Sequence, residues 1–180
     1  ELLKDRRGNL TLTNINGLCR IALDKLKKTY EQDIQEKNIR IVFDNLTLSL
    51  MMEVNVEQFS KVLAGILKNS MYALLKKSET VTFSPEIFLG LKVNKDMLEI
   101  TIRDNGSGID ENIKDKIFAP FFTTKTTGEA AGVGLYLCRE IVQNHRGTIE
   151  VESKKGEYTQ FLITIPVYQP KTITLPKEEE

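Results

Sequence analysis

A long amphipathic helix is the feature that most constrains what this 180-residue chain can fold into. Asn55 resembles a helix N-cap, because Gln58 stands three residues later, at the spacing of a capping box. Side chains suited to burial then recur at the three-four spacing of a helix: Phe59, Val62, Leu63, Ile66, Leu67, Ser70, Ala73 and Leu74. The pattern predicts a long helix that buries one face and exposes the other.

The composition is that of one ordinary soluble domain, with 41% hydrophobic and 28% charged residues. A chain of this length buries roughly 70% of its unfolded surface, so it needs no disulfide or structural metal for stability. Twenty-five Lys and Arg residues balance 25 Asp and Glu residues. This balance argues against a general binder of nucleic acid or anionic membranes, so any anionic ligand must be bound by local groups.

The cysteine and histidine content narrows the chemistry further. Cys19 and Cys138 lie far apart in helix-like segments, which favours buried thiols in a reducing compartment over a bridge or a metal site. His145 is the only histidine, so neither a Ser/His/Asp set nor a zinc cluster is expected, and interaction with a helix dipole explains its place at a helix end. No apolar run reaches membrane-spanning length, and a chain that begins with Glu and lacks a signal peptide is expected to be a fragment.

The remaining periodicities predict helices and strands in mixed order. A helix is expected over residues 15–35, with Thr13 and Asn14 as caps, and another over residues 135–145. Residues 46–54 give no clear pattern. Strands are expected over residues 38–44, 83–93, 98–104, 148–153 and 159–166, with hairpin turns at 94–96 and 156–157.

A carboxylate at the end of an apolar strand is followed by two glycines, in the order Asp104-Asn105-Gly106-Ser107-Gly108. Such a carboxylate can accept a hydrogen bond from an amine held in a pocket, and the glycines let the backbone approach a flat ligand. The alternative is a tight turn capped by Asp, which is the simpler interpretation of the segment taken alone.

Three other features could bind a phosphate group or its metal ion. Gly132 and Gly134 open a helix, where free backbone N–H groups can bind phosphate oxygens. The amide oxygen of Asn69, on the polar edge of the long helix, could ligate Mg²⁺. Lys125 follows the aromatic segment 117–122 and could reach a phosphate from a lid. Each also has a structural interpretation: a helix start, a solvated amide, and a core plug leading into a loop.

Taken in order, these segments resemble the catalytic and ATP-binding domain of sensor histidine kinases, in the GHKL superfamily with its Bergerat-type fold. LAGILKNS resembles the N box, DNGSGID the first glycine box, IFAPFFTTK the F box, and AGVGLYLCREIVQNHRGTIEVES the second glycine box with its following strand. The resemblance runs from about Leu12 to Pro166. The FFTTK sequence in the F box is most similar to that of the nitrogen-regulator type of kinase.

This resemblance implies an α+β fold, a two-layer α/β sandwich in which helices cover one face of a mixed, mostly antiparallel sheet. ATP would lie between the N-box helix and a mobile lid over residues 123–131, anchored by Phe121 and Phe122. The implied site residues are Asn69 for Mg²⁺, Asp104 for the adenine amine, Gly106 and Gly108 along the ring, Thr159 near adenine, and Lys125, Gly132, Gly134 and Leu135 at the phosphates. The expected boundaries are an upstream linker or helix over 1–12, the ATP-binding domain over 13–166 and a flexible tail over 167–180.

Three residues depart from the family pattern: Gly65 replaces an asparagine, Tyr72 a basic residue and Ala130 a glycine. Gly65 also stands where related ATPases carry a glutamate that activates water. Helical geometry predicts that a side chain at position 65 would point towards the triphosphate, and a mid-helix glycine also permits close approach of a neighbour or ligand.

The resemblance implies a protein-histidine kinase that transfers the γ-phosphoryl of ATP to a histidine on a helical dimerisation domain of the same parent protein. His145 is not that acceptor, because it follows the second glycine box, so the domain alone would have nothing to phosphorylate. A response regulator would act downstream, and the location would be cytoplasmic, with membrane attachment of the parent left open. This domain itself would contact neither nucleic acid nor membrane. Two alternatives stay open, a conformational ATPase of the same superfamily and a degenerate module that only senses nucleotide.

Overall fold

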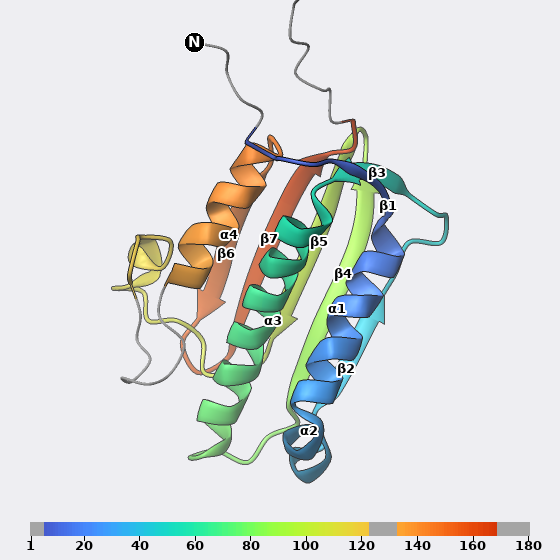
Figure 1. Ribbon diagram of the computed structural model, residues 1–180. Coiled ribbons are helices and arrows are strands. Elements are labelled where there is room, and N and C mark those ends of the chain that lie inside the picture. The colour runs from blue at the N-terminus through green and yellow to red at the C-terminus, as the bar shows by residue number, and fades with distance from the viewer. Residues whose placement is uncertain (1–5, 123–132, 169–180) are drawn as a thin grey trace, which may run out of the picture.

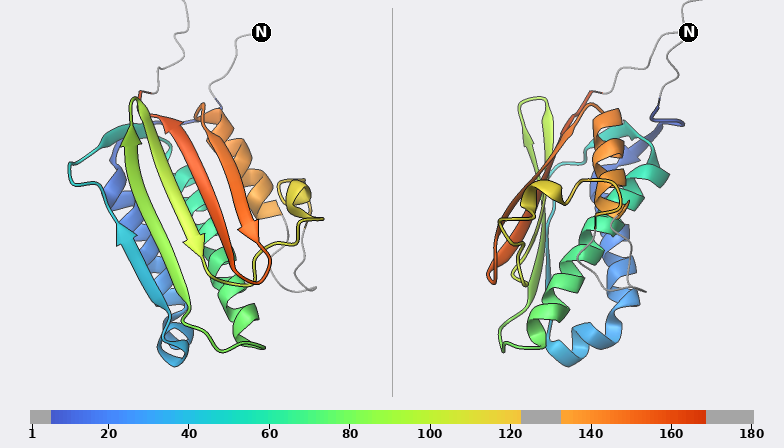
Figure 2. Two further views of the ribbon diagram at one scale, coloured as in Figure 1. Left: turned by 180° about the vertical axis from the view of Figure 1, so that it is seen from behind. Right: turned by 90° about the vertical axis from the view of Figure 1, so that its left-hand side faces the viewer.

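The computed structural model describes residues 6–122 and 133–168, which form a layer of helices on one face of a five-stranded sheet (Figures 1 and 2). The helices are α1 (Ile15–Thr29), α2 (Glu31–Lys37), α3 (Val56–Ser78) and α4 (Val133–Asn144), with a short 3-10 helix at Lys114–Lys116. The strands are β1 (Thr11–Asn14), β2 (Arg40–Asp44), β3 (Met51–Val54), β4 (Glu86–Asn94), β5 (Met97–Asp104), β6 (Thr148–Lys154) and β7 (Tyr158–Pro166). The expected α+β sandwich is confirmed.

The sheet has the order β2-β4-β5-β7-β6, and only its β2–β4 pair is parallel. The central ladder between β5 and β7 places Asp104 opposite Thr159. Partners in a ladder project to the same face of the sheet, and Ile102 and Phe161, two residues along each strand, belong to the core. The Asp104 and Thr159 side chains therefore lie on the face that the helices cover.

Helix α3 runs across the middle of this face, between α1 and α4 (Figure 1). Its buried residues are those that the sequence pattern predicts, with Met71 in place of Ala73: Phe59, Val62, Leu63, Ile66, Leu67, Ser70, Met71 and Leu74. They pack against the apolar residues of β4, β5 and β7 in one continuous core. Within the described ranges, no helix is both long and apolar enough to cross a membrane.

The start of α3 differs from a full capping box. The Asn55 side chain accepts a hydrogen bond from the Gln58 backbone N–H at 3.0 Å, as the sequence predicts. The Gln58 side chain does not return the bond, because the Asn55 backbone N–H donates instead to Nε2 of His145 at 3.2 Å. The α3 N-terminus is thus held by a residue 90 positions away in the sequence.

The first part of the chain departs from the expected helix over residues 15–35. The predicted cap Asn14 is confirmed, since its side chain accepts from the Gly17 backbone N–H at 3.0 Å. Helix α1 ends at Thr29, however, and Tyr30 lies between it and α2, which has no fully buried residue. The fully buried residues of α1 end at Leu26, so burial gives no reason for the first helix to continue far beyond this residue.

Strands β1 and β3 form a separate two-stranded ribbon that the sequence did not reveal. Its register pairs Thr11 with Val54 and Asn14 with Met51. Met52 and Val54 are buried while Met51 is exposed, so a four-residue strand carries only two inward positions. Two buried positions in alternation are too few to distinguish a strand from a loop by sequence pattern.

Candidate nucleotide-binding site

Asp104 is a buried carboxyl group at the end of β5. One of its oxygens accepts a hydrogen bond from the Gly106 backbone N–H at 2.9 Å. Burial raises the pKa of Asp104 to about 7, although that hydrogen bond, Ser70, and the charges of Lys77 and Arg103 act in the opposite direction. A carboxyl group kept this far from water is suited to bind a hydrogen-bond donor of a ligand.

Ser70, on α3, is the second buried polar group beside Asp104. Its hydroxyl is 1% exposed and favours the ionised form of the Asp104 carboxyl, yet it makes no hydrogen bond of normal geometry within the described part of the chain. A buried hydroxyl without such a partner is costly. Its place beside a buried carboxyl fits a site that is completed by a polar ligand.

The two glycines after Asp104 pack against protein backbone. A Cβ at Gly106 would lie 2.6 Å from the carbonyl carbon of Ala73 on α3, and the Ser107 N–H donates to the Ala73 oxygen at 3.1 Å. Gly108 has a φ of 66°, and a Cβ there would overlap the carbonyl oxygen of Lys154 in the β6–β7 hairpin. Close packing therefore requires both glycines, while their contact with an adenine ring stays a prediction.

Asn105 fixes the same loop to the start of β4. Its side chain accepts from the Glu86 N–H and donates to the Ser84 oxygen, both at 2.8 Å. Its backbone oxygen accepts from Nζ of Lys77 at 2.9 Å. The glycine loop is thus joined to α3 and to β4 directly after Asp104.

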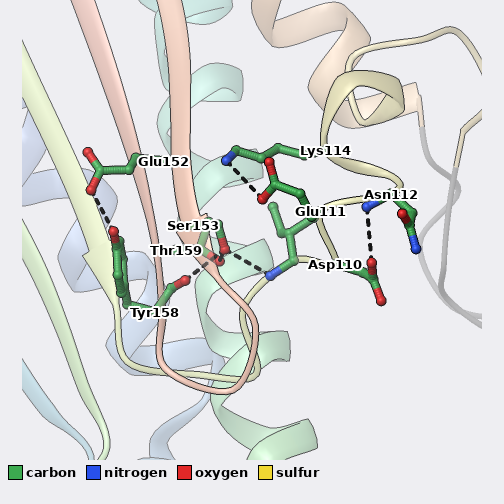
Figure 3. Close-up of polar contacts among 9 residues, drawn as sticks. Asp110, Glu111, Asn112, Lys114, Glu152, Ser153, Tyr158 and Thr159 are labelled. Carbon is green, nitrogen blue, oxygen red and sulfur yellow. Dashed lines mark hydrogen bonds and ion pairs between the residues drawn. The ribbon is translucent and has the colours of Figure 1, made fainter.

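Thr159, opposite Asp104, belongs to a chain of hydroxyl contacts (Figure 3). Its Oγ1 lies 3.0 Å from Oγ of Ser153, which also accepts from the Ile109 backbone N–H at 2.8 Å and donates to the Tyr158 oxygen at 2.7 Å. Figure 3 shows Ser153 and Thr159 together beside the turn that leads to Asp110. Sequence reasoning did not single out Ser70 or Ser153, because a lone serine in a helix or strand carries no signal of its own.

The expected metal and phosphate ligands are placed only in part. Asn69 is half-buried on α3, immediately before Ser70. Gly134 is exposed in the first turn of α4. Among the described residues outside its own helix turn, no atom lies within 4 Å of the place that a Cβ would take, and Leu135 is half-buried against the core. The backbone N–H groups at the start of a helix suit an anionic group. Lys125, Gly132 and Ala130, and the lid expected over residues 123–131, lie outside the described residues.

Phe118 is the buried aromatic residue that packs the F-box segment against the core, whereas Phe121 and Phe122 were expected to anchor the lid. Phe118 is buried, its ring meets that of Phe161 edge-on at 6.2 Å, and the Arg139 guanidinium of α4 lies 5.5 Å from its centre. Phe121 is 82% exposed and Phe122 half-buried. Phe118 thus fits the core-plug interpretation, while the anchoring of the lid by Phe121 and Phe122 stays a prediction, because the lid lies outside the described residues.

Gly65 permits close approach of a neighbouring helix. A Cβ at this position would lie 3.3 Å from Sγ of Cys138 on α4, the one contact within 4 Å among the described residues outside its own helix backbone. Any side chain at position 65 would start in contact with α4, so the packing of the two helices explains the glycine. Cys138 and Cys19 are free and buried, as expected, and burial raises the pKa of each thiol to about 12.

His145 is fully buried between α3 and α4. Its Nε2 accepts from the Asn55 N–H, and its Nδ1 lies 2.8 Å from the Ile141 oxygen. A nitrogen that accepts an N–H bond carries no proton, so Nδ1 donates to Ile141 and the ring is neutral. The predicted interaction with the helix end is present, but as a neutral hydrogen bond and not as a cation at the dipole.

The site combines a buried carboxyl group with a buried hydroxyl group that lacks a hydrogen bond of normal geometry. Both lie where a glycine loop packs between α3 and a sheet that helices cover on one face. This combination defines a class of α/β sandwich suited to bind a polar ligand. Residues 55–169 match the family described as histidine kinase-, DNA gyrase B-, and HSP90-like ATPase. The match covers more than half of the chain, so the chain belongs to this family. Several relatives and structural neighbours are histidine kinases by name, and with the family match they identify an ATP-binding catalytic domain of the histidine kinase type in the GHKL superfamily.

Individual relatives cover most of this chain. The chain is 35% identical over 149 residues to cyanobacterial phytochrome A of Nostoc sp. and 28% identical over 167 residues to the sensor histidine kinase ZraS of Salmonella typhi. These matches cover 81% and 93% of the chain but 18% and 33% of the two relatives, so the chain spans a third or less of their length.

Among solved structures, the catalytic domain of histidine kinase ThkA has a TM-score of 0.72 at 28% identity. The match covers 88% of this chain and 96% of that one. ThkA is also known in complex with the response regulator protein TrrA, where the TM-score is 0.67 at 25% identity and the match covers 89% of this chain and 42% of ThkA.

Proposed function

We propose that this domain binds Mg-ATP and transfers its γ-phosphoryl group to a histidine on a separate helical dimerisation domain of the parent protein. The observation that carries the proposal is the buried Asp104 carboxyl, with the Ser70 hydroxyl beside it, at the loop that follows β5 and packs against α3. Membership of an ATPase family supports a nucleotide as the ligand.

Each part of the nucleotide has a proposed set of contacts. Asp104 accepts a hydrogen bond from the adenine amine, and Thr159 faces the same edge of the base. Gly106 and Gly108 form the loop along the ring. Further sites are proposed for the triphosphate: Gly132, Gly134 and Leu135 at the start of α4, with Lys125 reaching a phosphate.

Asn69 is the proposed Mg²⁺ ligand, through its side-chain oxygen. Magnesium is usually held by one or two protein oxygens together with substrate phosphates and water. Within the described residues, no group of three or more His, Cys, Asp or Glu side chains could enclose a metal ion. That finding fits an ion shared between the protein and the triphosphate, where it would neutralise charge during phosphoryl transfer.

The phosphoryl acceptor must come from outside the described fold. His145 is fully buried, and both nitrogens of its ring are engaged in hydrogen bonds. A nucleophile needs a free nitrogen beside the γ-phosphate, which His145 does not offer. The proposed partners are therefore the parent's dimerisation domain and, downstream, a response regulator, in line with the ThkA–TrrA complex.

Calorimetric titration of Mg-ADP into the wild type and the Asp104→Asn variant tests the base contact. The amide can turn an NH₂ donor towards the adenine amine, and a buried mispaired group costs roughly 1 to 3 kcal/mol. We expect affinity to fall by about tenfold or more. Asp110→Asn is the matched control, because Asp110 is an exposed carboxylate paired with Lys155 at 2.9 Å. Equal affinity in wild type and Asp104→Asn would contradict the adenine assignment.

A further inference from the structure

Ser153, on β6, is a buried hydroxyl group with three polar neighbours and a single hydrogen to donate. The Ile109 backbone N–H can only donate to it, and the Tyr158 carbonyl oxygen can only accept from it. These two contacts use the Ser153 proton and one of its lone pairs.

The third contact, with Thr159, then has only one arrangement. Because the Ser153 proton is directed at the Tyr158 oxygen, the Thr159 hydroxyl must be the donor across the 3.0 Å between the two oxygens. This assignment satisfies all three contacts, whereas the reverse would leave the partly buried contact with the Tyr158 oxygen without a proton. Thr159 keeps only lone pairs for a ligand.

Two hydrogen-bond acceptors consequently face each other across the β5–β7 ladder. One is the Asp104 carboxylate, and the other is Oγ1 of Thr159, its cross-strand partner. A base whose edge carries an amino group donates to such a pair. A base with a carbonyl group at that place would set its own lone pairs against both, which is costly in a buried site.

We infer that Ser153 is a positioning residue that fixes the Thr159 hydroxyl as an acceptor and thereby selects 6-amino purine nucleotides over 6-oxo purine nucleotides. The inference rests on the proposed function, that a purine nucleotide occupies this site. It gives Ser153 a part in ligand choice although another side chain stands between it and the base.

The test compares ADP with IDP, which carries a carbonyl group at position 6 and a proton on N1. Both are titrated with Mg²⁺ by calorimetry at pH 8, where the Asp104 carboxyl is largely ionised because its pKa is about 7. We expect the wild type to bind IDP about 10- to 100-fold more weakly than ADP. In Ser153→Ala the Thr159 proton is free to turn to the base, so the ADP-to-IDP ratio of affinities should fall roughly threefold to tenfold. A merely structural loss would weaken both nucleotides and leave the ratio unchanged.

Three further variants isolate the Thr159 hydroxyl. Ser153→Thr keeps a hydroxyl and should restore the wild-type ratio. Thr159→Val removes the group on which Ser153 acts, so adding Ser153→Ala to it should change the ratio no further. Thr148→Ala is the matched control, since it removes an exposed hydroxyl from the other end of β6. If Ser153→Ala does not fold, Ser153→Cys replaces it, because a thiol of similar size is a weak hydrogen-bonding group.

An unchanged ADP-to-IDP ratio in a folded Ser153 variant would overturn the inference while leaving the proposed function intact. A wild-type domain that binds neither ADP nor IDP would overturn the proposed function and this inference with it. The two failures are thus distinguished by wild-type binding alone.

Discussion

The Asp104 carboxyl, for which we propose a contact with adenine, destabilises the fold when it is ionised. Its native pKa of about 7 lies above the value near 4 that is usual for an unfolded chain. The folded state therefore binds the proton more tightly, so the contribution of Asp104 to stability is present below about pH 4 and is lost as pH rises through about 7. Above about pH 7 the nucleotide-free domain holds a buried carboxylate, and an uncharged side chain at this position would make the domain more stable.

The corresponding prediction concerns the Asp104→Asn variant without nucleotide. An amide keeps an oxygen to accept from the Gly106 N–H and carries no charge to desolvate. We expect the variant to be more stable than wild type by about 1 to 3 kcal/mol at pH 8. The difference should diminish towards pH 4. Urea unfolding at both pH values measures it, and a variant less stable than wild type at pH 8 would contradict the argument.

At the scale of elements, the His145 ring joins the end of α4 to the start of α3. It accepts from the α3 N-cap, donates to Ile141 in the last turns of α4, and its ring meets Phe59 edge-on at 4.9 Å. Contacts that join the ends of two helices can form in only one relative position of the two helices. Gly65 and Cys138 make the close contact between the same two helices.

Replacing His145 by alanine should therefore weaken the helix layer. The change leaves the Asn55 N–H without its partner and opens a cavity beside Phe59. We expect the free energy of unfolding to fall by about 3 to 5 kcal/mol. Gln143→Ala, an exposed change two residues earlier on α4, should shift it by less than about 0.5 kcal/mol. Chemical denaturation of both variants measures this, and similar stability of His145→Ala and Gln143→Ala would rule the link out.

For the whole molecule, binding and chemistry are expected to be separable. Position 65 is glycine and offers no side chain to activate water, and a general base typically supplies ~10²- to 10⁴-fold in rate. We expect negligible phosphate release from ATP by this domain alone, and phosphoryl transfer once a cognate helical domain presenting a histidine is added. The measurements are steady-state phosphate release and radiolabel transfer in trans. Brisk release that Asn69→Ala abolishes would favour the ATPase alternative over the kinase.

Most of the architecture could be predicted from the sequence, because the long periodic segments each bury one face. The helix from Asn55, the two hairpins and the carboxyl at the end of β5 all follow from local patterns. What could not be predicted depends on distant partners. The His145 bond to Asn55 and the contact of Ser153 with Ile109 join residues 90 and 44 positions apart, and no local periodicity records such pairs.

The hydrogen bond between His145 and Asn55 also fixes one end of α4, so a tilt of this helix would pivot at that end. The helix has 12 residues and is about 18 Å long, with the exposed Gly134 at the end away from His145. A tilt of about 10° around His145 would carry Gly134 through about 3 Å, while the tied end stays in the core. A tilt of this size would change the distance between Gly134 and the phosphate site proposed there, and Gly65 leaves room for Cys138 where α4 contacts α3.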